Sequence, residues 1–476
     1  MDSPTIDPAE LFKIIEEIDD VELRNTISFI LDKPLHQLNY YLVNVRRFSE
    51  SFPSQPLTEY ISIKSIHEKL GRNGVKVFLA VDQVLSLLPR QRLSEAVNSV
   101  RKNQDLEIIR SIGRTLYSNY LKTVNGLELE KLVYEDSRKE HVLLAIPSER
   151  QLNIVKGRWR EYAWREKTVK GDVTPSIEGW INDVTNISDA LNSEGVKTTI
   201  IADRFLEGRL PVNKMKVFYL DMTEDLCKIG YVRDSSVTWF NRPIICNMAL
   251  KFRRGEEELM NEVYWKLGLI PVIRPRWIVE GDKLIRLKME GGNFFLIKGD
   301  GEAGFVTGLG VRGTDFQLFN LLDKIFPKEV RFFAVPLAGY LKDWISGAVH
   351  LDVVLTYIGE VGEGRIMLVD PSRMGFYSII EYDRVSKNPK IMPFIEFAKE
   401  FEIIIDELPR RDGSPITSLN VLNLGDGKLV VDMYNKDANR YLEKELKVDL
   451  IQVDISHIEA GGGGPRCATR DIISLT

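Results

Sequence analysis

Apolar residues recur at helical spacing through the first 134 residues of the chain. Asp7 and Pro8 provide a helix cap and a first-turn proline, and apolar side chains follow at positions 11, 14, 15 and 18. Further periodic segments, with few glycines, span residues 21–31, 34–48, 75–88 and 93–121. The pattern predicts an all-α region that ends at a charged connector over residues 135–140.

The pattern changes at His141, where helices and strands begin to alternate. Helices are predicted over residues 177–194, 255–267, 315–326, 393–401 and 437–446. Each is followed by a predicted strand, over residues 198–202, 269–273, 330–335, 402–405 and 448–453. Five such units fit either a doubly wound sheet or a closed, propeller-like ring, and periodicity alone does not distinguish the two. No GxxxxGK[ST] loop for nucleotide phosphates occurs.

The composition is that of an ordinary globular chain of 476 residues, 44% hydrophobic, with a formal net charge of -5. No large basic field is present, so nucleic acid is not an expected partner, although residues 64–77 have the pattern of a helix-turn-helix. The N-terminus lacks a signal peptide, and no apolar run approaches the ~20 residues of a membrane span. Three scattered cysteines fit a reducing compartment. We therefore expect a soluble cytoplasmic protein without a membrane partner.

Four consecutive glycines lie shortly before Cys467 in the C-terminal segment AGGGGPRCATRD. Such a run does not suit a helix or strand interior, but it suits a loop whose backbone approaches something small. A thiol on this loop is a candidate nucleophile if a base and an electrostatic partner are nearby. The alternative is an inert buried cysteine in a terminal linker, and the loop alone favours neither interpretation. Cys227 and Cys246 are expected to be packing residues.

Charged residues interrupt apolar or glycine-rich sequence at three other places. Asp234 lies in the segment RDSS, just before a strand-like run, and Glu290 opens EGGN ahead of a predicted strand. His350 and Asp352 are two residues apart in a predicted strand, AVHLDVVL, which would place both side chains on one face. Each also has a structural interpretation: a turn cap for Asp234, a solvated rim for Glu290, and an exposed polar face for the pair.

Together, a cysteine, a histidine, a glutamate and two aspartates suit the chemistry of a guanidinium group. Two carboxylates bind its in-plane N–H groups in fixed geometry, and its positive charge compensates for their burial. A thiolate attacks the resonance-stabilised carbon better than water does, and the bound cation lowers the pKa of the thiol. A histidine protonates the departing nitrogen and then deprotonates the incoming water.

The ordered motifs RDSS, EGGN, HLD and GGGGPRC resemble those of the guanidino-group-modifying enzymes, and of arginine deiminases most closely. The resemblance implies an α/β fold, the pentein five-unit αβ propeller, over about residues 141–476. An all-α accessory domain would precede it, which gives domains over residues 1–138 and 139–476. The helical insertion that arginine deiminases usually carry within the pentein has no counterpart in this sequence.

The resemblance also implies a role for each motif residue. Cys467 would be the nucleophile, His350 the general acid and base, and Asp234 and Asp352 the clamp for the guanidinium. Glu290 would bind the substrate beside the histidine. An S-alkylthiouronium intermediate would form on the cysteine, and the chemistry requires neither a metal nor an organic cofactor.

Arginines that bind the substrate α-carboxylate are part of the same resemblance. Arg312, in GLGVRGT, matches one such motif, and Arg253, in MALKFRR, matches another, although a one-residue shift would select Arg254. Two such arginines favour L-arginine over agmatine, which has no carboxylate. Asn293 and Gly464 complete the predicted substrate-binding set.

The leading prediction is a homo-oligomeric, arginine deiminase-like hydrolase that converts L-arginine to citrulline and ammonia. An amidinotransferase would keep the covalent intermediate but pass the amidino group to an amine. An arginine dihydrolase would continue to ornithine, and Asn293, in place of the family's usual aspartate, leaves this open. A non-catalytic pentein that serves as a binding module is the remaining alternative, and the presence of all five catalytic candidates argues against it. Lys228 stands where the family commonly has an asparagine, which puts substrate positioning in doubt.

Overall fold

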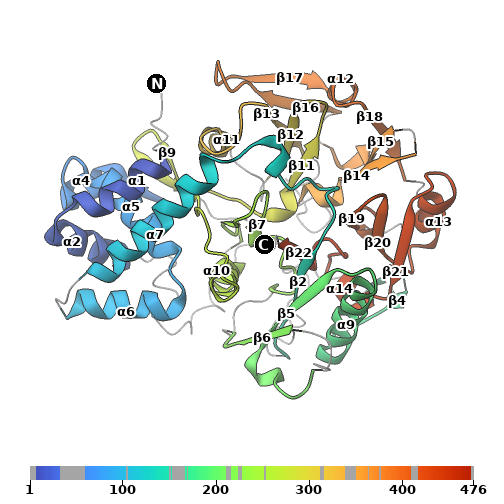
Figure 1. The fold of residues 1–476 in the computed structure, drawn as a ribbon, viewed down its shortest axis with the longest axis horizontal. Helices are drawn as coiled ribbons and strands as arrows, with labels where there is room; N and C mark the ends of the chain where they lie inside the picture. The colour runs from blue at the N-terminus through green and yellow to red at the C-terminus, as the bar shows by residue number, and fades with distance from the viewer. Residues whose placement is uncertain are drawn as a thin grey trace.

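A computed structural model gives the fold of the chain (Figure 1). It describes residues 7–32, 59–102, 106–149, 152, 167–168, 170–210, 216–222, 228–250, 253–310, 316–337, 350–362, 364–374, 377–408 and 416–472. Within these ranges, no helix is both long enough and apolar enough to cross a membrane. The predicted helix over residues 34–48 lies outside the described residues.

The N-terminal helices lie together on one side of the molecule (Figure 1). They are α1 (Pro8–Glu17), α2 (Asp20–Leu31), α4 (Ile63–Leu70), α5 (Gly74–Ser86), α6 (Arg90–Arg101) and α7 (Glu107–Val124). The Asp7 carboxylate caps α1 as the sequence predicts, because it accepts a hydrogen bond from the backbone N–H of Ala9 at 2.8 Å. The periodic segment over residues 93–121 forms two helices, α6 and α7, instead of one. Helix α5 is largely buried, so it is not available to enter a nucleic-acid groove.

One short strand interrupts this helical region, which is therefore not helical throughout. Strand β1 (Tyr60–Ser62) pairs antiparallel with β10 (Lys283–Arg286), which pairs in turn with β9 (Trp277–Glu280). A single hydrophobic cluster also joins the N-terminal helices to side chains of the later sheets. The N-terminal region is thus attached to the rest of the chain through both backbone pairing and shared core.

The rest of the described chain builds several small sheets. The largest contains β11 (Phe294–Lys298), β12 (Ala303–Leu309), β13 (Val330–Pro336), β16 (Ser378–Tyr382) and β17 (Pro389–Pro393). Another contains β22 (Thr469–Ile472), β2 (His141–Ile146), β5 (Lys197–Asp203) and β6 (Lys216–Leu220). Three-stranded sheets contain β14 (Leu355–Val361), β15 (Gly364–Val369) and β18 (Ile403–Glu407), and β19 (Leu422–Gly425), β20 (Lys428–Asp432) and β21 (Asp449–Val453). Two-stranded pairs are β3 (Lys167–Thr168) with β4 (Gly171–Asp172), and β7 (Ser236–Val237) with β8 (Ile244–Ile245). No sheet among the described residues closes on itself.

Four of the five predicted helix–strand units are present. They are α9 (Ile177–Ser193) with β5, α11 (Gln317–Leu322) with β13, α12 (Phe394–Glu400) with β18, and α13 (Lys436–Lys444) with β21. In each unit the strand pairs in parallel with a strand that comes earlier in the chain than the helix. The pairs are β5 with β2, β13 with β12, β18 with β15, and β21 with β20. The fold is therefore α/β.

The strand predicted over residues 269–273 is wrong. Helix α10 (Glu256–Lys266) forms as expected, but an irregular segment follows it. Pro271 lies in the middle of this segment, and a proline has no N–H to give to a strand ladder. The segment is instead tied to the β8 region by two backbone hydrogen bonds, from Ile245 N to Ile273 O and from Val272 N to Pro243 O.

Candidate active site

Four of the predicted motifs come together in the interior. Asp234 precedes β7, and Glu290 precedes the 3-10 turn η6 (Gly291–Asn293) that opens β11. His350 precedes a second 3-10 turn, η7 (Leu351–Val353), and Cys467 lies in the loop between α14 (Ser456–Ala460) and β22. All of these side chains are buried.

The predicted strand that carries His350 and Asp352 is wrong, because both residues lie at the η7 turn and β14 begins only at Leu355. A tight turn ahead of the strand still brings the two side chains to the same place. Asn293 supports this turn from the neighbouring motif, since its side-chain oxygen accepts a hydrogen bond from the backbone N–H of Leu351 at 3.1 Å.

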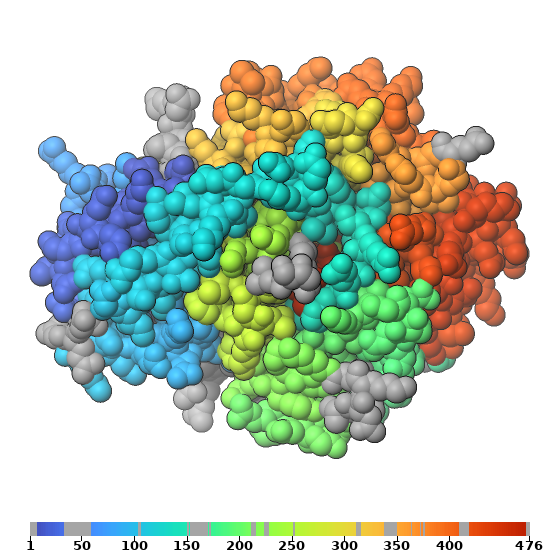
Figure 2. Space-filling view, viewed as in Figure 1, coloured from blue at the N-terminus to red at the C-terminus, as the bar shows by residue number. Residues whose placement is uncertain are grey.

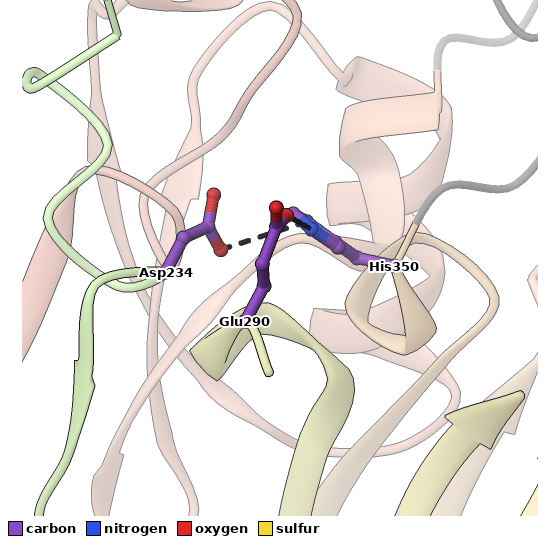
Figure 3. Close-up of side chains that lie close together, drawn as sticks. All are labelled: Asp234, Glu290 and His350. Atoms are coloured by element: carbon purple, nitrogen blue, oxygen red, sulfur yellow. Dashed lines mark hydrogen bonds and ion pairs between the residues drawn. The ribbon is translucent and has the colours of Figure 1, made fainter. Parts of the chain in front are cut away.

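His350 lies between two carboxylates (Figure 3). Its Nε2 is 2.5 Å from Glu290 Oε2, and its Nδ1 is 3.5 Å from Asp234 Oδ1. Burial by itself would lower the pKa of the imidazole, but Asp234 and the bond to Glu290 outweigh it, and the pKa of His350 lies above its usual value. This shift favours the protonated imidazolium, which can donate a proton, over the neutral ring.

The nucleophile candidate is next to the other aspartate. Cys467 Sγ is 3.5 Å from Asp352 Oδ2, and the same oxygen is 2.9 Å from Arg466 Nη1. Burial, followed by the charges of Asp352 and Asp234, raises the pKa of the Cys467 thiol well above its usual value, whereas Arg466 lowers it. These surroundings favour the neutral thiol, and a further positive charge nearby would favour the thiolate.

Gly292 marks the point where these groups converge. A Cβ at this residue would lie 2.7 Å from Asp234 Oδ1, 2.9 Å from His350 Nδ1 and 3.2 Å from Asp352 Oδ2. The backbone N–H of Gly292 also donates to Asp234 Oδ1 at 3.1 Å. Any side chain would fill the space that the three groups face, so this position requires glycine. The two glycines of EGGN are the sequence signal for this requirement.

Asn420 holds the nucleophile loop and was not predicted. Its Oδ1 accepts hydrogen bonds from the backbone N–H groups of Gly464, at 3.1 Å, and Cys467, at 2.9 Å. Its Nδ2 donates to the backbone oxygen of Asp352 at 3.2 Å. A Cβ at Gly464 would lie 2.6 Å from the backbone oxygen of Asn420, so the loop packs against this residue without room for a side chain. Nothing in the surrounding sequence SLNVLNL distinguishes Asn420 from a packing residue.

The three candidate arginines have different surroundings. Arg253 is buried, with Nη1 2.6 Å from Asp234 Oδ2 and Nη2 2.7 Å from Glu256 Oε2. Arg254 pairs instead with Glu59 at the start of β1. Arg312 lies outside the described residues. The one-residue choice in MALKFRR therefore places Arg253 against the site and Arg254 against the N-terminal region.

Lys228 and Cys246 were also considered from the sequence, and His457 lies ten residues before Cys467. His457 Nδ1 accepts a hydrogen bond from Ser176 N at 3.3 Å, which fits a structural role. Cys246 is buried, and Cys227 lies outside the described residues. Lys228 is buried with its Nζ 3.3 Å from the backbone oxygen of Gly461, at the start of the nucleophile loop.

The carboxylates and imidazole together form a site for a cation. Within the described chain, one set of residues has the arrangement of a possible metal-binding group, namely Asp234, Glu290 and His350, whose ligand atoms lie within 4.8 Å of one another. A planar guanidinium is also a cation, and it gains fixed hydrogen bonds from carboxylates on either side. The Cys467 thiol lies next to Asp352, with Sγ 3.5 Å from Oδ2.

Comparison with known proteins agrees with this geometry. Residues 203–473 match the family model of arginine deiminase. Over 278 residues the chain is 23% identical to the uncharacterized protein YkgA of Bacillus subtilis, covering 58% of this chain and 81% of that protein.

Two solved structures show more distant likeness. One is a dimethylarginine dimethylaminohydrolase from Pseudomonas aeruginosa with citrulline, at 15% identity, 71% coverage of this chain, 100% of that chain and a TM-score of 0.42. The other is the N-terminal domain of ArgZ, a cyanobacterial arginine dihydrolase, with its substrate. It is 12% identical, the match covers 70% of this chain and 98% of that chain, and the TM-score is 0.47. Since the family model spans more than half of the 476 residues and includes every motif of the site, the chain belongs to the arginine deiminase family.

Proposed function

We propose that the protein hydrolyses the guanidino group of L-arginine to give citrulline and ammonia. The observation that supports this best is the convergence of Asp234, His350 and Asp352 on the space over Gly292, with Cys467 next to Asp352. Two buried carboxylates, a proton donor and a thiol within a few ångströms match the requirements of a guanidinium substrate.

Binding of the substrate supplies the charge that the resting site lacks. The guanidinium would donate in-plane hydrogen bonds to Asp234 and Asp352, the two aspartates that face the space over Gly292. Its positive charge beside Cys467 offsets the effect of the carboxylates on the thiol, so the pKa of the thiol falls and the thiolate forms. The nucleophile is therefore activated only when a cation is bound.

The reaction then proceeds in two halves. The thiolate adds to the central guanidinium carbon, and the C–N bond to a terminal nitrogen breaks as His350 protonates that nitrogen, which leaves as ammonia. The product is an S-alkylthiouronium on Cys467. Neutral His350 next takes a proton from water, whose oxygen adds to the same carbon. The C–S bond then breaks and the proton on the added oxygen passes to solvent, which returns the thiolate and releases the ureido group of citrulline.

Recognition of the other end of arginine falls to Arg312. Arg253 is already paired with Asp234 and Glu256, so it positions the clamp in this structure. Arg312 is the remaining arginine whose motif matches a carboxylate-binding position, and L-arginine is favoured over agmatine on that basis. Gly464 would contribute to substrate binding through the shape of the nucleophile loop.

The second candidate function depends on which molecule accepts the amidino group from the cysteine. An amine in place of water would make the protein an amidinotransferase, and a second hydrolysis would make it a dihydrolase that yields ornithine. Asn293 accepts a hydrogen bond from the backbone N–H of Leu351 in the η7 turn. The presence of an asparagine where the family usually has an acid therefore also affects the support of His350 and Asp352.

The test is to incubate the purified protein with L-arginine, with and without glycine, and to identify products by mass spectrometry. Citrulline and one ammonia per turnover, independent of glycine, support the deiminase. Ornithine with a new guanidino product, only when glycine is present, would mean an amidinotransferase. Ornithine without glycine, with carbon dioxide and two ammonias, would mean a dihydrolase. No turnover of any guanidine would favour the binding module.

The architecture proposed with this function is a five-unit αβ propeller over about residues 141–476, with a helical accessory domain before it. The four helix–strand units and the arrangement of the small sheets around β22 support it (Figure 1). A homo-oligomer in the cytoplasm completes the proposal. Light scattering of the purified protein tests the oligomeric state, since a monomeric mass would contradict it.

A further inference from the structure

We infer that Glu135 and Arg466 form a positioning pair that orients Asp352 and tunes the charge around Cys467. The inference rests on the proposed function for its effect on turnover, but not for its effect on the thiol. Glu135 belongs to the connector between the N-terminal helices and β2, so the pair also makes this connector part of the active-site support.

Arg466 is fixed from four directions. Its Nε is 2.8 Å from Glu135 Oε1 and its Nη2 is 3.1 Å from Glu135 Oε2, which is a bidentate pair. The Nη2 also donates to the backbone oxygen of Phe294 at 2.8 Å, and the guanidinium lies 4.1 Å from the centroid of the Phe295 ring. The remaining Nη1 points to Asp352 Oδ2 at 2.9 Å. The side chain of Arg466 is 1% exposed.

The connector that carries Glu135 is itself anchored. Figure 2 shows the chain after α7, in teal, lying across this face of the molecule between the helical region and the strands. The Glu135 backbone N–H donates to Leu296 O at 2.8 Å in β11, and Val133 N donates to Trp239 O at 2.8 Å. Buried Lys139 donates to the backbone oxygens of Tyr134, Glu135 and Ser137. Glu135 is therefore placed by the backbone and does not depend on side-chain pairing alone.

The consequence for Asp352 is a fixed orientation. Arg466 and the Cys467 thiol lie against Oδ2, whereas Oδ1 is buried without a hydrogen-bond partner among the described residues. Oδ2 is also the oxygen that faces the space over Gly292, so Arg466 holds the carboxylate with this oxygen toward the proposed substrate position. A carboxylate that was free to rotate would lose this orientation, so the pair contributes to the geometry of the guanidinium clamp.

The two members of the pair act on the thiol with opposite signs. The charged groups that influence Cys467 are Asp352 and Asp234, which disfavour the thiolate, and Arg466, which favours it. Glu135 lies on the far side of Arg466, and its negative charge partly offsets the positive charge of Arg466. Arg233 and Lys139 in turn partly offset the negative charge of Glu135. His350, when protonated, adds a positive charge on the other side of Asp234. Loss of Arg466 should therefore disfavour the thiolate, and loss of the Glu135 charge should favour it.

The test measures alkylation of Cys467 by iodoacetamide as a function of pH, with peptide mapping to assign the adduct. Arg466→Gln is expected to move the midpoint up by about one pH unit, a tenfold change in acidity, and Glu135→Gln to move it down. Arg466→Lys keeps the charge but not the bidentate bond, so its midpoint should stay near that of the wild type while kcat/KM for arginine falls about tenfold or more. Asp82→Asn breaks another buried pair, with Arg276, and serves as the matched control without a shift.

Opposite shifts of the alkylation midpoint in Arg466→Gln and Glu135→Gln support the role of the pair even if the protein turns over no guanidine. Failure of the proposed function is therefore distinguishable from failure of this inference. Shifts in the same direction, or no shift in either variant, would overturn it. If the neutral variants do not fold, Arg466→Lys decides: wild-type kcat/KM in a folded Lys variant refutes the positioning role.

Discussion

The Asp234 carboxylate lies between Arg253 and His350, with Oδ2 2.6 Å from Arg253 Nη1 and Oδ1 3.5 Å from His350 Nδ1. Arg253 in turn reaches Glu256 at the start of α10, so a buried chain of alternating charges leads from the helix to the histidine. Removal of one of these side chains leaves its partners buried without an opposite charge. The resulting loss of folding free energy is larger than the net contribution of the intact ion pair.

We expect Arg253→Gln to lower the free energy of unfolding by about 3 kcal/mol, because Asp234 and Glu256 would stay buried without their cation. Urea denaturation measures the change. Arg209→Gln is the control, since the Arg209 pair with Glu178 is exposed and its loss should change the free energy of unfolding by less than about 1 kcal/mol. Equal losses in the two variants would contradict the buried charge chain.

Gly292→Ala should strongly reduce turnover while the fold is kept. The new methyl group would occupy the space that Asp234, His350 and Asp352 face, so guanidinium binding should weaken together with kcat. A decrease of about 100-fold or more in kcat/KM is expected for such a misplaced clamp. Gly126→Ala is the matched control, because its Cβ would have a nearest contact of 3.4 Å. Near-normal activity of Gly292→Ala would mean that the substrate binds elsewhere.

Cys467→Ala should have no measurable turnover but should still bind arginine, because the carboxylate clamp is unchanged. Isothermal titration calorimetry measures the binding, and mass spectrometry of the wild-type protein during turnover should find the covalent intermediate on Cys467. Cys246→Ala, at the other described cysteine, should remain active. Turnover by the Cys467 variant would remove the assigned nucleophile.

The pH dependence of kcat/KM should report the pair formed by His350 and Glu290. Acidic neighbours raise the pKa of His350, so the protonated donor persists to higher pH and is lost as pH rises through that pKa. Glu290→Gln removes one negative charge but keeps an oxygen that can accept the hydrogen bond. The pH at which activity declines on the alkaline side should therefore move down by about one unit. An upward shift would contradict the acid role of His350.

Arg312→Ala should reduce kcat/KM for L-arginine far more than for agmatine, because agmatine has no carboxylate to pair with the lost guanidinium. A difference of about 10-fold to 100-fold between the two substrates is expected for a charged hydrogen bond. Competition assays with both substrates in one reaction measure the ratio directly. Equal losses on both substrates would exclude a carboxylate contact.

The sequence predicts the composition of the site better than its local geometry. The motifs around Asp234, Glu290 and Cys467 identify residues that lie together, because each motif combines a charged or reactive side chain with glycines or a strand end. The strand predicted for His350 and Asp352 is wrong, since alternating apolar residues also occur where a 3-10 turn leads into a strand. Asn420 and Glu135 act through contacts with residues distant in the chain, and no local pattern reports such contacts.

The pairing of strand β1 with β10 affects how the chain folds during synthesis. It emerges from the ribosome more than 200 residues before its partner β10, so the sheet that joins the two regions forms only late in synthesis. Without β1, the outer edge of β10 would present unpaired backbone groups to solvent, and such an edge promotes self-association. The N-terminal region therefore also covers the edge of β10, and a chain shortened to the residues after this region is expected to self-associate through that edge.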